Sequence, residues 1–64
     1  MIKVAIMFNE TDDTFEAYYY SIRFRIFGPS IFGYITSWSD ENGLIERLHK
    51  KIYGKIRFIR IVEV

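Results

Sequence analysis

The chain has 64 residues, one histidine and no cysteine, which excludes a disulfide framework and a zinc site built from cysteine and histidine. Half of the residues are hydrophobic and 19% are aromatic, so we expect a single small domain over residues 1–64. The formal net charge of +1 is far from the strongly basic balance of a dedicated nucleic-acid-binding protein.

The N-terminal segment predicts a strand followed by a turn. Large apolar side chains stand at every second position over residues 2–8, with Lys3, Ala5 and Met7 between them, which is typical of a strand. Residues 9–14 are polar and rich in Asn, Asp and Thr, the composition of a hairpin loop. No sustained apolar run of a signal peptide follows, and no stretch approaches the roughly 20 apolar residues of a membrane span. We therefore expect a cytoplasmic protein without membrane contact.

A second strand is predicted over residues 15–27, because side chains alternate with a period of two from Tyr18 to Phe27. Such a strand is long for a small domain, so a bend or bulge is expected near residues 19–21. A helix over residues 13–27 is the alternative, since a capping box could start it and Gly28-Pro29 could end it. That helix would have no clean apolar stripe, which favours the strand.

The next segment predicts a third strand and then a helix. Gly28-Pro29-Ser30 has the composition of a turn, and residues 31–38 follow it as a strand. A helix is predicted over residues 40–53, with an N-cap oxygen from Ser37 or Ser39. Its apolar stripe consists of Leu44, Ile45, Leu48 and Ile52.

A last strand is predicted over residues 55–64, after Gly54 has ended the helix. Its alternation slips between Phe58 and Ile59, which indicates a bulge or a strand covered on both faces. The expected fold class is therefore α+β, with element order β-β-β-α-β. A right-handed crossover gives a four-stranded mixed sheet of order 3-2-1-4 with one helix packed on one face.

This arrangement resembles the first half of a ribonuclease-H-type fold. It is also similar to small antitoxin domains of the HicB type, in which a Gly-x-x-Thr segment precedes the helix. Gly33-Tyr34-Ile35-Thr36 stands at that place here, and the likeness covers roughly residues 1–52. A chain of this size has little volume for a concave catalytic site, so we expect a compact protein that binds a partner stoichiometrically, in the manner of an inhibitor or antitoxin encoded by a mobile element.

Residues with catalytic or metal-binding potential are few and poorly spaced. His49 lies on the predicted helix beside lysines, away from a nucleophile. The acidic loop of residues 10–13 lacks the glycine and the distal glutamate of a calcium loop. Strand one carries Lys3 where a two-metal nuclease needs a carboxylate. We expect no enzyme activity, metal, cofactor or small-molecule substrate.

The remaining candidate is a binding surface, and the expected partner is a protein. Tyr, Trp and Arg are enriched in interface hot spots, and seven such residues are candidate partner-binding residues. They are Tyr19, Arg23, Arg25, Tyr34, Trp38, Arg57 and Arg60.

Nucleic acid is the alternative partner. Phe32-Gly33-Tyr34-Ile35 matches the middle of the aromatic strand of RNA-recognition motifs, whose rings stack on bases. On this alternative, an aromatic and basic sheet face would bind single-stranded RNA or DNA.

Self-association is also expected, because one helix covers only one face of a sheet. The second face would leave apolar residues in water, an uncommon feature of soluble monomers. The candidate homodimer interface residues are Met7, Phe15, Ala17 and Phe27. In that homodimer, Arg23 and Arg25 would contact the partner's acidic loop at residues 10–13.

Overall fold

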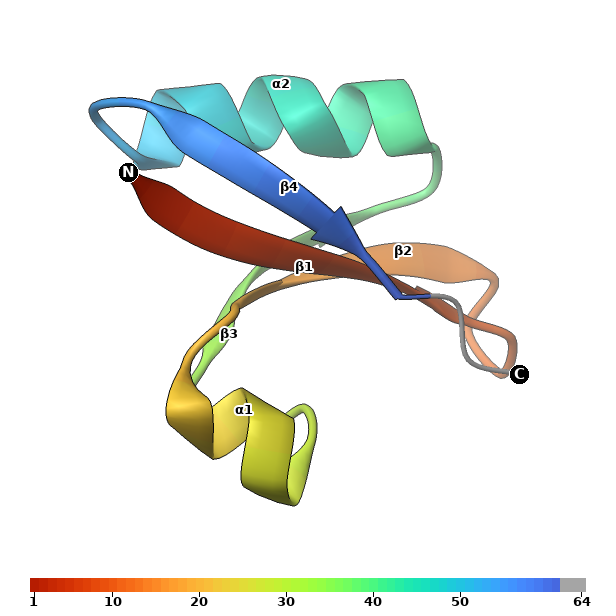
Figure 1. The fold of residues 1–64 in the computed structure, drawn as a ribbon. Coiled ribbons are helices and arrows are strands. Elements are labelled where there is room, and N and C mark those ends of the chain that lie inside the picture. Colours follow the sequence, from red (N-terminus) through yellow and green to blue (C-terminus); the bar gives the residue numbers. More distant parts are fainter. Residues whose placement is uncertain (62–64) are drawn as a thin grey trace.

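The structure, a computed structural model, describes residues 1–61. Four strands form one mixed sheet of order β3-β2-β1-β4, in which β1 is antiparallel to β2 and parallel to β4 (Figure 1). The elements in chain order are β1 (Ile2–Asn9), β2 (Thr14–Tyr19), α1 (Ile22–Phe27), β3 (Tyr34–Trp38), α2 (Glu41–Lys51) and β4 (Ile56–Arg60). The predicted α+β fold and sheet order are confirmed.

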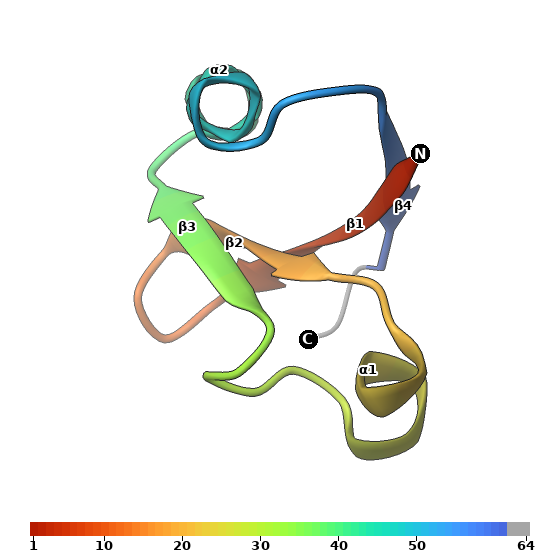
Figure 2. The ribbon, with the colours of Figure 1, turned by 90° about the vertical axis from the view of Figure 1, so that its left-hand side faces the viewer.

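The two helices lie on opposite sides of the sheet, as the view in Figure 2 shows. Beneath α2, the core contains Val4, Ile6 and Ala17 of the sheet with the predicted helix stripe. On the other side, Phe24 of α1 packs with a smaller cluster of Ala5, Met7 and Tyr18. The sheet therefore has a core on each face.

Helix α2 begins one residue after Asp40, whose side chain accepts a 2.7 Å hydrogen bond from the Gly43 N–H. Asp40 has extended backbone angles and satisfies one of the free donors of the first turn, so it is the N-cap. The predicted N-cap at Ser37 or Ser39 is wrong. The helix ends at Lys51, and Gly54 adopts a positive φ of 107° in the turn to β4.

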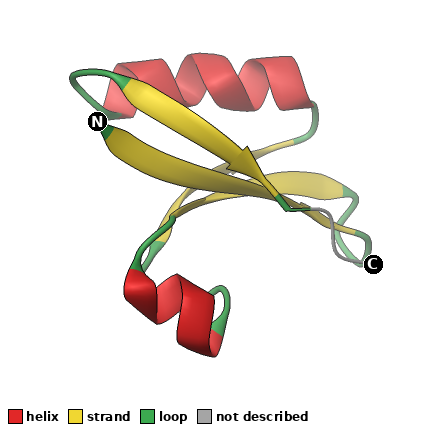
Figure 3. Cartoon of the chain, viewed as in Figure 1, coloured by secondary structure: helices red, strands yellow, loops and turns green. Residues whose placement is uncertain are grey.

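The prediction of a strand through residue 27 is wrong, because residues 22–27 form α1 (Figure 3). Tyr19, the last residue of β2, pairs with Val4 of β1. Because β1 begins at Ile2, a longer β2 would extend past the start of β1 and have no partner along that edge. A helix satisfies its backbone groups internally. Helix α1 ends at Phe27, and Gly28 is its C-cap: the φ of 79° at Gly28 suits glycine, and the Gly28 N–H donates to the Phe24 carbonyl.

Four smaller expectations concern strand ends and bulges. The bulge expected near residues 19–21 lies slightly earlier, as a register shift between Ala17 and Tyr18. Strand β3 starts at Tyr34, later than predicted. The β1–β4 ladder runs without a shift from Ile56 to Arg60, so no bulge occurs at Phe58 in this ladder. The predicted continuation of the last strand over residues 62–64 lies outside the described residues.

Candidate binding surface

The exposed apolar side chains of the described structure are concentrated around α1. Of eleven large hydrophobic residues that are exposed within residues 1–61, five lie between residues 22 and 32. Their exposed fractions are 69% for Ile22, 66% for Ile26, 79% for Phe27, 83% for Ile31 and 85% for Phe32. We call these five residues, with Arg23 and Arg25, the α1 surface.

This exposure follows from the length of α1. A helix of six residues presents little more than one side chain to the sheet, and that side chain is Phe24. The ring of Phe24 lies 5.9 Å from that of Tyr18 and 5.5 Å from that of Tyr20. The helix is therefore held by one aromatic anchor, while Ile22, Ile26 and Phe27 point to solvent.

The arginines of the α1 surface have no acidic partner in the described part of the chain. The one ion pair there joins Arg60 to Glu41, at the far side of the sheet. Arg23 and Arg25 are exposed and contact no carboxylate. Two guanidinium groups beside five apolar side chains are a composition that suits a partner with both apolar groups and carboxylates.

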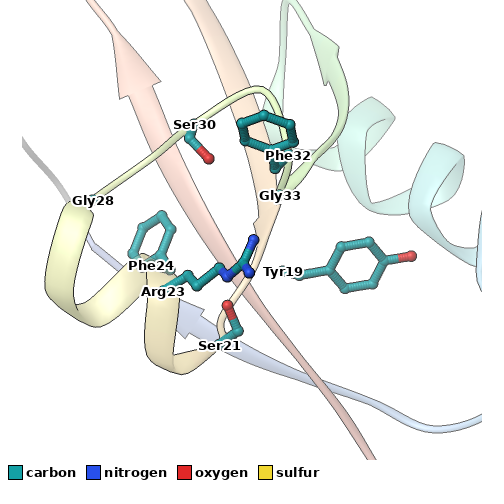
Figure 4. A pocket seen from close by; sticks show the side chains of 8 residues that line it. All are labelled: Tyr19, Ser21, Arg23, Phe24, Gly28, Ser30, Phe32 and Gly33. Atoms are coloured by element: carbon teal, nitrogen blue, oxygen red, sulfur yellow. The ribbon is translucent and has the colours of Figure 1, made fainter.

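A cavity of about 120 Å³ lies between α1 and the loop that leads to β3. Figure 4 shows the Arg23 side chain extending between Ser21 and Ser30 toward Phe32. A second hollow shares Arg23, Ser30 and Phe32 and continues to Phe27. The α1 surface is therefore indented around the Arg23 side chain.

A third hollow, of opposite charge, lies between the β1–β2 hairpin and the loop after α1, with a volume of about 300 Å³. We call it the acidic groove. It is lined by Met7, Phe8, Asn9, Glu10, Thr11, Glu16 and Pro29. Burial raises the pKa of the neighbouring Tyr18, and the negative charge of Glu16 raises it further.

The seven predicted partner-binding residues do not share one sheet face. Tyr19 and Arg23 meet at the cavity beside α1, and Arg25 lies on the same helix. Residues 22–27 form a helix and not a strand, so Arg23 and Arg25 do not lie on the sheet with the other four predicted residues.

Those four residues have separate surroundings. Trp38 lies under the guanidinium of Arg47, whose carbon is 3.8 Å from the centre of the indole. Tyr34 packs on Tyr18 and donates a hydrogen bond to the Ser37 hydroxyl. On β4, Arg60 pairs with Glu41 of α2. Arg57 lies opposite Lys3 in the β1–β4 ladder.

The four predicted dimer residues are also divided. Ala17 is fully buried and Phe15 half-buried in the cluster beneath α2, whereas Met7 is buried on the α1 side. Only Phe27 is exposed. The expected open second face of the sheet is wrong, because Phe24 covers part of it; the exposed apolar area lies on α1 instead.

The described residues show no arrangement for metal binding, since residues 1–61 contain no group of three or more His, Asp or Glu side chains that could hold an ion. His49 is exposed on α2, with its ring nearly perpendicular to that of Phe58. Among these residues there is also no helix with the length and apolarity to span a membrane.

Sequence reasoning missed Ile22, Ile26, Ile31 and Phe32 as surface residues. The signal was present in the sequence: five apolar side chains flank Gly28-Pro29, a turn that normally carries polar residues. An apolar cluster around such a turn is a sign of an exposed binding segment.

The chain was compared with models of protein families, with curated proteins and with solved structures, and none of the three comparisons gave a match.

Proposed function

We propose that the protein is non-catalytic and acts by stoichiometric binding of another protein through the α1 surface, in the manner of a small inhibitor or antitoxin encoded by a mobile element. The observation that supports this is the exposure, between 66% and 85%, of five Ile and Phe side chains within eleven consecutive residues. Large apolar groups gathered in this way on a small protein mark an interaction site.

The energy available at this surface is sufficient for specific binding. Burying one Phe or Ile side chain contributes about 1.5–3 kcal/mol, and an Arg that pairs with a carboxylate in a desolvated interface adds to this. A few such side chains supply most of the affinity of a typical interface. Phe27 and Phe32, which line one hollow together with Arg23, are the expected anchors.

The composition of the surface favours protein over single-stranded nucleic acid. Nucleic-acid sites use aromatic rings for stacking and several basic groups for phosphates. Here three of the five apolar side chains are isoleucines, which offer no stacking face, and two arginines accompany them. The predicted aromatic and basic sheet face is not assembled.

Site-specific photo-crosslinking in the organism that produces the protein tests this proposal. A photoreactive phenylalanine analogue replaces Phe27 or Phe32 in the chain, and Tyr53 in a matched control. Tyr53 is an aromatic residue that is 93% exposed but lies outside the α1 surface. We expect the first two positions, and not Tyr53, to give an adduct with one other protein.

Mass spectrometry identifies what is attached. Adducts at equal yield from all three positions, or no adduct from Phe27 and Phe32, would contradict the proposal. An adduct that disappears after nuclease treatment, from a complex whose affinity falls steeply with salt, would favour the nucleic-acid alternative.

A further inference from the structure

The α1 surface and the acidic groove lie on the same side of the sheet, and the loop after α1 borders both, because Pro29 lines the groove and Ser30 lines the hollows around Arg23. Helix α1 follows Tyr20, whose N–H donates to the Lys3 carbonyl near the start of β1. The acidic groove lies at the other end of β1, where the hairpin pairs Asn9 with Thr14. In Figure 1 α1 projects from the sheet on the side away from α2, with the hairpin at the distant end.

The two sites are complementary in chemistry. The α1 surface presents apolar side chains with Arg23 and Arg25, and neither arginine contacts a carboxylate within residues 1–61. The acidic groove has Met7 and Phe8 among its lining residues and the carboxylates of Glu10 and Glu16 beside them. Positive charge beside apolar groups at the α1 surface thus matches negative charge beside apolar groups at the acidic groove.

We propose that, in the free protein, the α1 surface is covered by a second copy of this chain. A two-fold axis parallel to the sheet, on its α1 side, brings the α1 sides of the two copies face to face, so that Arg23 and Arg25 of each copy meet Glu10 and Glu16 of the other. This inference rests on the proposed function, because the same surface serves both. The second copy and any other protein partner therefore exclude each other.

Two-fold symmetry lets one dimer make the contact between the α1 surface and the acidic groove twice. A contact between the two sites occurs twice in one closed dimer, which leaves neither site free to recruit a third chain. A stable interface buries about 800 Å² of each partner, or about one sixth of the 4835 Å² exposed here. The dimer also supplies burial that a chain of 64 residues lacks when alone.

Charge reversal with complementation tests the dimer on the purified full chain. We expect sedimentation equilibrium at micromolar concentration to give twice the chain mass of 7.7 kDa. R23E/R25E and E10K/E16K should each raise the dissociation constant by about 100-fold or more. An equal mixture of the two variants should form a dimer again, because reversed charges meet reversed charges. E46K/K50E, on the exposed side of α2, is the matched control and should stay dimeric.

A monomeric wild-type chain would overturn the inference, and so would a mixture that stays monomeric although both variants are folded by circular dichroism. If E10K/E16K does not fold, F27S takes its place: F27S should be monomeric and Y53S dimeric, and a dimeric F27S would contradict the inference. A wild-type monomer that still cross-links to another protein through Phe27 would refute only the dimer. Loss of every adduct would refute the proposed function itself.

Discussion

The indole of Trp38 lies against the backbone of Gly43, so closely that a Cβ atom at position 43 would overlap the ring. The guanidinium of Arg47 stacks on the same ring, 3.8 Å from its centre. Glycine inside a helix costs about 1 kcal/mol relative to alanine. At Gly43 this cost is compensated by the close approach of β3's last side chain to α2.

This contact predicts that the effect of Gly43→Ala changes sign with residue 38. In the wild-type background the added methyl displaces the indole and should lower the free energy of unfolding by about 1 kcal/mol. In a Trp38→Ala background the same substitution should raise it by about 1 kcal/mol through helix propensity. Urea unfolding measures both values, and the single tryptophan reports the displacement by fluorescence. Equal effects in the two backgrounds would show that ring and glycine are not coupled.

The N-cap of α2 gives a second prediction with a matched control. Asp40→Ala removes the acceptor of the Gly43 N–H and should cost about 1 kcal/mol of folding stability. Ser39→Ala, one residue earlier, should change stability by less than about 0.5 kcal/mol. Thermal unfolding of the two variants compares them directly. A larger loss of stability for the Ser39 variant than for the Asp40 variant would show that Ser39 is the N-cap, as the sequence suggested.

The anchor of α1 and its exposed residues should respond differently to truncation. Phe24→Ala removes the side chain that packs on Tyr18 and Tyr20, and should cost about 3 kcal/mol. Phe32→Ser alters a side chain that is 85% exposed and should leave monomer stability within about 0.5 kcal/mol. Denaturant unfolding at a concentration below dimer formation separates these effects. A strongly destabilised Phe32 variant would mean that the loop after α1 supports the fold.

Tyr18 should make the protein less stable in alkali. Its pKa is raised above the ordinary value of 10.0 by burial, and then by the negative charge of Glu16. Below pH 10 the phenol is protonated in both states; as the pH rises further, the unfolded chain loses the proton first. The stabilising contribution is therefore present below pH 10 and is lost as the pH rises through the folded-state pKa.

Unfolding free energies measured at about pH 8 and about pH 11 check this sign. Tyr18→Phe should lose less stability between the two conditions than the wild type does. Tyr53→Phe, at a position that is 93% exposed, is the control and should follow the wild type. A Tyr18 variant with the same alkaline loss as the wild type would contradict the assignment.

The sheet and α2 could be predicted from the sequence because their signals are local and redundant. Residues 2–8 are apolar with a period of two, as a strand requires. Leu44, Leu48 and Ile52 repeat at helical spacing, and all three are buried against the sheet. Strand order followed from the chain's connections, since a helical crossover returns the last strand beside the first.

The geometry of the candidate site could not be predicted, although its apolar composition was visible in the sequence, because that geometry depends on where β2 loses its partner. Residues 22–27 have a period of two, and that pattern describes a strand only while a neighbouring strand is available. Tyr19 is already opposite Val4, near the start of β1, so the chain beyond it forms a helix. Arg23 is therefore in a helix and not in the predicted strand, because of a limit to strand pairing that a single sequence does not reveal.

The parallel ladder between β1 and β4 has a consequence for the order in which this protein folds. β1 is a central strand, and Val4–Met7 are all buried, yet one of its two neighbours is the last described element of the chain. Pairing β4 with β1 brings together residues from the two ends of the described chain. Closing this long loop has an entropy cost that arises before any contact compensates for it. During synthesis, one edge of β1 therefore stays unpaired until residue 60 has left the ribosome. If β1, β2 and β3 pair before that point, the unpaired edge of β1 is open to other chains, and aggregation would compete with completion of the fold.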